Sequence, residues 1–107
     1  MNPEFMEKLV DLREALNSPM RINSAYRTPE HNSRVSSSGL NGPHTTGKAI
    51  DIGIAGEPAY HMVLLAMSMG FTGIGVRQSG DWNGRFIHLD CLENEETRPR
   101  PALWSYP

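Results

Sequence analysis

Two short stretches of the sequence carry residues that could bind a metal ion. The segment HTTGKAIDI places His44 seven residues before Asp51, and the segment RFIHLD places His88 two residues before Asp90. A carboxylate inside an apolar strand is costly unless a partner stabilises its charge. Two histidines and one carboxylate are a common ligand set for catalytic zinc, which leaves a fourth position for water. The sequence therefore makes His44, Asp51 and His88 candidate zinc ligands.

The same residues also allow a purely structural interpretation. Asp51 could cap a loop or pair with Lys48, and His88 could be a core histidine whose hydrogen bonds are satisfied by the protein. The sequence has no H-E-x-x-H signature that would decide in favour of the metal. Cys91 lies three residues after His88, so the two point to opposite faces of a regular strand and a thiol–imidazole nucleophile pair is not expected.

Strand alternation predicts how the candidate ligands are placed. One strand is expected over 48–54 and another over 85–92. Alternation puts Asp51 on the face of the first strand opposite its isoleucines, and it puts His88 and Asp90 together on one face of the second. Because neighbouring strands lie about 4.8 Å apart, side chains far apart in sequence can meet there.

The rest of the chain predicts one mixed domain spanning residues 1–107. Helices are expected over 2–17, 28–35 and 57–70, strands over 21–26 and 73–76, and an extended surface tail over 98–107. In the first helix, apolar residues recur at helical spacing at Phe5, Leu9, Leu12 and Leu16. The last two strands are joined by a loop too short for a crossover helix, so they are expected to be antiparallel. This pattern favours an α+β fold.

Charge and composition narrow the classes of partner. The net charge is −2 and no long basic block is present, so nucleic-acid binding is not expected. The longest apolar stretch, 62–69, is too short to span a bilayer, and the first 17 residues do not resemble a secretion signal. Cys91 is the only cysteine, which excludes an intrachain disulfide and a thiolate metal cage. We expect a monomer that is made in the cytoplasm.

Three segments, INSAYRTPEHN, HTTGKAIDI and FIHLD, resemble the M15 family of zinc peptidases in their order and spacing. This family includes D-Ala-D-Ala carboxypeptidases and peptidoglycan endopeptidases such as phage endolysins. The resemblance implies one Zn²⁺ held by His44, Asp51 and His88, and an Arg27 directed at the substrate. The alternative for Arg27 is an ion pair with Glu30. The resemblance also implies a small α+β domain with a central antiparallel sheet, of the type shared by D,D-peptidases and hedgehog proteins.

Two positions depart from the family pattern. Many members have a serine where this chain has Gly42, and some have an acidic general base where it has Arg85. The candidates for the base are then Asp90 and Asp81. Asp90 could instead be a carboxylate that orients a ligand histidine.

The predicted function is that of a zinc-dependent peptidase acting on peptidoglycan stem peptides that contain D-amino acids, as a carboxypeptidase or as an endolysin-type endopeptidase. The alternative is a non-catalytic, zinc-containing cell-wall-binding module of the same fold. The expected setting is a phage- or prophage-encoded protein that acts on the cell wall.

Overall fold

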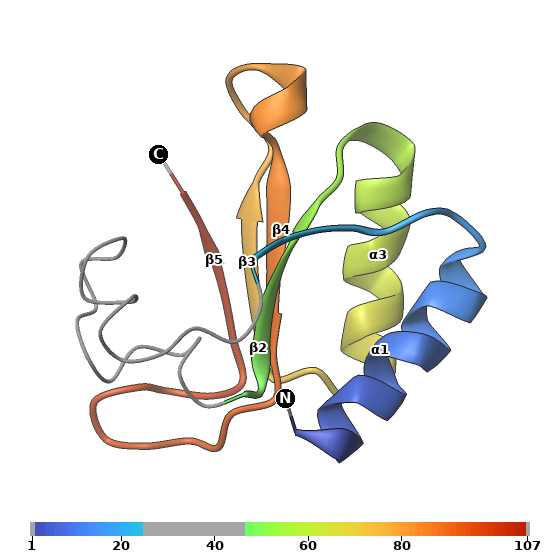
Figure 1. The fold of residues 1–107 in the computed structure, drawn as a ribbon. Helices are drawn as coiled ribbons and strands as arrows, with labels where there is room; N and C mark the ends of the chain where they lie inside the picture. Colours follow the sequence, from blue (N-terminus) through green and yellow to red (C-terminus); the bar gives the residue numbers. More distant parts are fainter. Residues whose placement is uncertain (1, 25–46, 107) are drawn as a thin grey trace.

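A five-stranded sheet forms one layer of the molecule, and the helices α1 and α3 lie together on one of its faces (Figure 1). The computed structural model describes residues 2–24 and 47–106. In chain order the elements are α1 (Pro3–Leu16), β1 (Arg21–Ser24), β2 (Ala49–Gly53), α3 (Gly56–Ser68), β3 (Gly73–Arg77), the 3-10 helix η3 (Trp82–Gly84), β4 (Phe86–Asp90) and β5 (Ala102–Ser105). The predicted α+β class is confirmed. The helix predicted over 28–35 lies outside the described residues.

The first helix forms as its sequence predicts. The side chain of Asn2 accepts a hydrogen bond from the Phe5 backbone N–H at 3.0 Å, which caps the start of α1. Asn17 ends the helix in the left-handed conformation, with φ at 53°, and donates its N–H to the Arg13 carbonyl. The buried residues of the helix are the predicted apolar stripe, Phe5, Leu9, Leu12 and Leu16.

The sheet has the predicted central antiparallel strands and one additional, parallel strand at its edge. Its strand order is β1-β2-β4-β3-β5, and the first three pairs are antiparallel, but β5 runs parallel to β3. The physical reason is that β4 ends opposite Gly73, where β3 begins. The chain loops out and returns at Ala102, beside that same residue, so β5 has to run in the direction of β3. The predicted surface tail therefore contains an edge strand.

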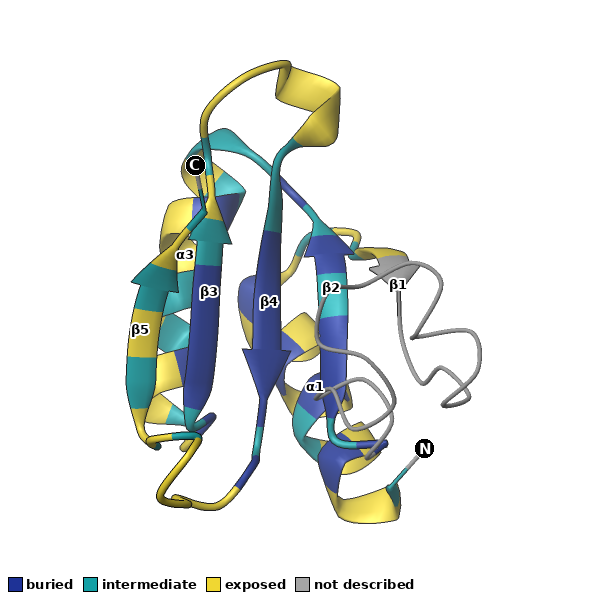
Figure 2. Ribbon diagram, turned by 90° about the vertical axis from the view of Figure 1, so that its left-hand side faces the viewer, coloured by how far each residue is buried: buried dark blue, intermediate teal, exposed yellow. Residues whose placement is uncertain are grey.

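The hydrophobic core lies between the sheet and the two helices. Figure 2 shows a buried band that crosses β2, β4 and β3. The strands direct a row of buried aliphatic side chains at the helices: Ile50, Ile52, Ile74, Ile87 and Leu89. Phe5 of α1 packs edge-on against Phe71, with ring centroids 6.0 Å apart. The core therefore fixes the face of β2 and β4 that carries the isoleucines, and leaves their other face for the candidate site.

Helix α3 buries two small side chains and one large one, while several of its larger apolar residues are exposed. Its buried residues are Ala59, Met62 and Ala66, whereas Tyr60 and Leu64 are 73% and 62% exposed. Two small alanines let the helix approach the sheet closely. The larger apolar residues on its outer side line a shallow groove that extends to Leu103 of β5.

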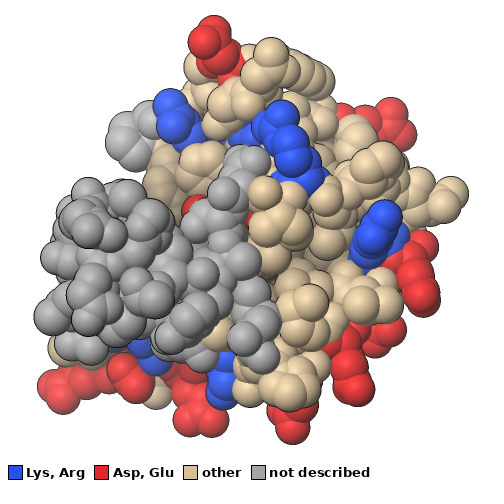
Figure 3. Space-filling model, viewed as in Figure 1, with Lys and Arg blue, Asp and Glu red and all other residues tan. Residues whose placement is uncertain are grey.

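The surface of the described residues carries mixed charge. On the face seen in Figure 3, Asp and Glu gather along the lower edge, and Lys and Arg lie scattered among them and above. Within residues 2–24 and 47–106, no helix has both the length and the apolar character that a membrane crossing requires.

Candidate metal centre

Asp51 and His88 face each other across the middle of the sheet. They are direct partners in the β2–β4 register, and strand alternation directs both away from the core face that carries Ile50, Ile52, Ile87 and Leu89. The Asp51 Oδ1 atom lies 3.0 Å from Nδ1 of His88. The His88 side chain is 4% exposed and that of Asp51 is 22% exposed. A carboxylate oxygen and a ring nitrogen therefore lie close together at a site that is mostly buried and is open to solvent on the Asp51 side.

Asp90 binds the other ring nitrogen of the same histidine. Its Oδ2 atom lies 2.8 Å from Nε2 of His88, and its side chain has no exposed surface. Strand alternation brings the two together, because residues 88 and 90 point to the same face of β4. An ionised carboxylate can only accept hydrogen bonds, so Nε2 of His88 must carry the hydrogen.

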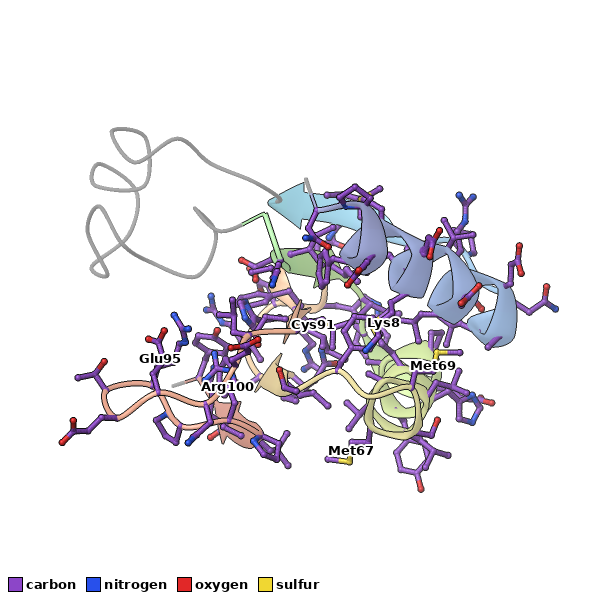
Figure 4. The ribbon with its side chains drawn as sticks, turned by 90° about the horizontal axis from the view of Figure 1, so that it is seen from below. Lys8, Met67, Met69, Cys91, Glu95 and Arg100 are labelled. Carbon is purple, nitrogen blue, oxygen red and sulfur yellow. The ribbon has the colours of Figure 1, made fainter. Side chains whose placement is uncertain are left out.

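Arg100 completes this buried network. Its Nε donates to Oδ1 of Asp90 at 2.9 Å, and its Nη2 donates to Oδ2 at 2.7 Å. The residue, labelled in Figure 4, belongs to the segment that joins β4 to β5, and its side chain reaches back to Asp90 at the end of β4. The backbone N–H of Leu92 adds a weaker hydrogen bond to Oδ1, at 3.3 Å. Both oxygens of the Asp90 carboxylate are thus occupied by donors.

Two glycines of β3 make room for this network. Gly75 lies between His88 and Trp104 in the strand register, and the Trp104 ring lies 5.3 Å from the imidazole, centroid to centroid. A side chain at Gly75 would collide with the Trp104 indole, and one at Gly73 would collide with the Asp90 carboxylate. Because these two positions have no side chains, the Trp104 ring can pack directly over Gly75 and the Asp90 carboxylate over Gly73.

The electrostatics of the cluster favour ionised groups. Burial opposes ionisation of Asp90, but hydrogen bonds from His88 and Arg100 outweigh it and hold the pKa of that carboxyl well below its usual range. Burial alone would lower the pKa of His88. The hydrogen bonds and negative charges of Asp51 and Asp90 overcome that effect and raise the pKa of the imidazole above its ordinary value. The site is therefore built to stabilise positive charge next to Asp51.

This geometry agrees with the family comparison. The family model described as Peptidase M15 matches residues 1–90. The chain belongs to the M15 peptidase family. The matched region contains His44, Asp51, His88 and Asp90, while Arg100 and strand β5 follow it. No curated protein and no solved structure shows a significant match to the chain.

The described part of this M15 chain contains two of the three predicted zinc ligands. His44 lies outside the described residues, and within the described ranges no group of three His, Cys, Asp or Glu side chains could hold a metal ion. The two ligands present fit a metal. Two atoms bound to one tetrahedral zinc at about 2.1 Å are about 3.4 Å apart, and Oδ1 of Asp51 and Nδ1 of His88 are 3.0 Å apart.

The other predicted residues of the M15 site lie in different surroundings. Arg27 is outside the described residues. Asp81 is exposed at the start of η3, beyond the Phe86 end of β4. Arg85 donates to the Gly80 carbonyl and stacks over the Trp82 ring, so it packs the loop between β3 and β4.

Arg100 is the site residue that sequence reasoning missed. The prolines on either side of it predicted an extended surface tail. One signal could have identified it: a carboxylate predicted to be buried at Asp90 requires a charged partner, and an arginine in the segment that follows is a natural candidate.

Proposed function

We propose that this M15 family member is a zinc-dependent peptidase that hydrolyses peptidoglycan stem peptides containing D-amino acids. The observation that carries the proposal is the convergence of Asp51 Oδ1 and His88 Nδ1 across β2 and β4, within the residue pattern of the family. In the metal-free protein this 3.0 Å contact is a hydrogen bond between the two side chains, and in the proposed site both atoms would instead bind the zinc.

The proposed ligands are His44, Asp51 and His88. Zinc in such a site polarises the scissile carbonyl and lowers the pKa of a bound water to about 7. Strands β2 and β4 hold Nδ1 of His88 and Oδ1 of Asp51 close enough together for both atoms to bind the same metal ion. Asp90 accepts the hydrogen of Nε2, which fixes the ring orientation and increases the basicity of Nδ1.

The surroundings of Asp90 favour the orienting role over that of general base. A general base must reach the attacking water, whereas Asp90 is fully buried and both of its oxygens accept hydrogen bonds. Asp81 remains the other candidate for the base. Arg27 is proposed to bind a substrate carboxylate or carbonyl through its planar fork, since stem peptides are rich in carboxylates.

A second candidate function is a wall-binding module of the same fold that retains zinc and lacks hydrolysis. Arg85 favours it, since this residue stands three positions before His88, where some family members carry an acidic base. In the structure its guanidinium is engaged by the Gly80 carbonyl and the Trp82 ring.

Digestion of purified peptidoglycan separates the two functions. We expect the zinc-loaded protein to release new amino and carboxyl termini from stem peptides, and mass spectrometry of the products identifies the bond that is cut. A chelator and the His88→Ala variant should both abolish release. Full zinc content and sedimentation with insoluble peptidoglycan, in the absence of any new termini, would instead establish the binding module.

A further inference from the structure

The guanidinium of Arg100 is held in one orientation by its own contacts. Its backbone N–H donates to the side chain of Asn94 at 2.9 Å, and its Nη1 donates to the Pro99 carbonyl at 2.8 Å. The charged group lies over the Trp104 ring, 5.0 Å from its centroid. Only 7% of the side chain is exposed. The fork that binds Asp90 is therefore fixed before any ligand reaches the site.

This fork controls how Asp90 meets the histidine. The two parallel hydrogen bonds to Oδ1 and Oδ2 determine the plane of the carboxylate, and Oδ2 in that plane lies 2.8 Å from Nε2 of His88. Without the fork, Oδ1 would keep only the weaker hydrogen bond from the Leu92 N–H, at 3.3 Å, and the carboxylate plane would be less firmly fixed. The contact to Nε2 then depends on Arg100, which acts on the histidine through Asp90.

We propose that Arg100 is a positioning residue for the metal centre: it locks Asp90 onto Nε2 of His88 and thereby reserves the Nδ1 lone pair of that histidine for the metal. In the metal-bound protein, the hydrogen of the neutral imidazole then has to reside on Nε2. This inference rests on the proposed zinc site and extends it to a residue beyond the segment matched by the family model.

The test compares Arg100→Gln and Arg100→Lys with the parent chain. Zinc affinity is measured by competition with a chromophoric chelator, at a temperature where circular dichroism shows each variant folded. We expect Arg100→Gln to bind zinc about 10–100-fold more weakly, the range for loss of a group that orients a ligand. Arg100→Lys keeps the charge but not the fork, and should fall between that variant and the parent.

Two controls separate positioning from general loss of stability. Arg98→Gln alters a neighbouring arginine that pairs with Glu95 instead of Asp90, and should bind zinc as the parent does. Leu9→Ala destabilises the core from α1 without touching the cluster, and should retain parental zinc affinity while it is folded. Equal weakening in Leu9→Ala and Arg100→Gln would overturn the proposal. Parental affinity in both Arg100 variants would overturn it as well.

A second readout does not depend on zinc. In metal-free, ¹⁵N-labelled protein, the Nε2–H of His88 should give a slowly exchanging, strongly deshielded proton resonance, because it is buried against Asp90. We expect this resonance to broaden or disappear in Arg100→Gln and to persist in Arg98→Gln. If the parent lacks hydrolysis or zinc, the proposed function fails, and this resonance still decides the role of Arg100. An unchanged resonance in Arg100→Gln would show that Asp90 keeps its hydrogen bond to His88 without Arg100, which would overturn the proposal.

Discussion

Gly73 and Asp90 are partners across β3 and β4, and the Asp90 carboxylate occupies the space that a side chain at residue 73 would need. A methyl group at that position would meet the carboxylate well inside van der Waals contact. The carboxylate cannot yield easily, because His88 and Arg100 hold it from two sides. The glycine is therefore part of the site, although it contributes no atom to the network.

The first prediction is that Gly73→Ala damages both stability and metal binding. Overpacking of this kind costs about 1–3 kcal/mol, and displacement of Asp90 should weaken zinc binding about 10–100-fold. Urea denaturation and chelator competition measure the two effects. Gly84→Ala is the matched control, since a Cβ there would meet no described atom within 4 Å. Parental zinc affinity in Gly73→Ala would show that Asp90 can move without consequence.

Asp90→Asn separates the two roles considered for this residue. The substitution keeps the shape of the side chain and removes its charge. If Asp90 orients His88, as its burial favours, zinc affinity should fall about 10–100-fold. A general base would show a different result: turnover lowered by about 10²–10⁴ with zinc retained. Unchanged turnover and unchanged zinc affinity would contradict both roles and leave Asp81 as the candidate base.

Removal of His88 should remove the metal. We expect the parent to contain one zinc per chain, and His88→Ala to contain almost none when it is measured by elemental analysis after dialysis. His61→Ala is the matched control, because His61 is exposed on α3, where its ring packs against Tyr60. Equal zinc content in the two variants would place the metal elsewhere in the protein.

Cys91 should react slowly with iodoacetamide in the folded protein. Burial raises the pKa of this thiol above its ordinary value, so at pH 8 it holds less thiolate than a free thiol with a pKa of about 8.5. Because the folded protein binds this proton more tightly than the unfolded chain, the thiol contributes to the free energy of unfolding at low pH. This contribution is lost as pH rises from the pKa of the unfolded thiol through that of the folded one. Mass spectrometry follows the alkylation rate from pH 7 to 10. The urea-unfolded chain is the control, and equal rates in the two states would contradict the prediction.

Loss of the α1 cap should lower stability without affecting the site. Asn2→Ala removes the acceptor of the Phe5 N–H, which typically costs about 1 kcal/mol. Asn17→Gly is the matched control, because glycine adopts the left-handed conformation of residue 17 without strain. A shift of the urea midpoint in Asn2→Ala alone supports the assignment. Zinc affinity should be the same in both variants.

Local patterns predicted the elements of the fold that bury one regular face. The stripe from Phe5 to Leu16 gave α1, and the alternation around Asp51 gave β2 with the correct face toward the core. The same alternation placed His88 and Asp90 together on β4. These predictions succeeded because side-chain direction within a helix or strand follows from the local period of the backbone.

The features that were missed depend on pairing between distant segments. No local period marks β5, whose place beside β3 follows from where the chain leaves β4. The reach of Arg100 to Asp90 depends on that return path and on the space that Gly73 leaves for the Asp90 carboxylate. Apolar character alone also did not identify the buried side of α3, since small Ala59 and Ala66 pack inward while Tyr60 and Leu64 are exposed.

The position of β4 at the centre of the sheet has a consequence for how the site exchanges with its surroundings. Hydrogen-bonded strands flank β4 on both sides, and its residues 87–90 are buried. Amide hydrogens in such a strand are replaced by deuterium only through rare, large openings, whereas those of edge strands exchange through small local ones. The backbone at His88 should therefore be among the last to take up deuterium. The strand that carries His88 therefore stays paired for longer than the edge strands do.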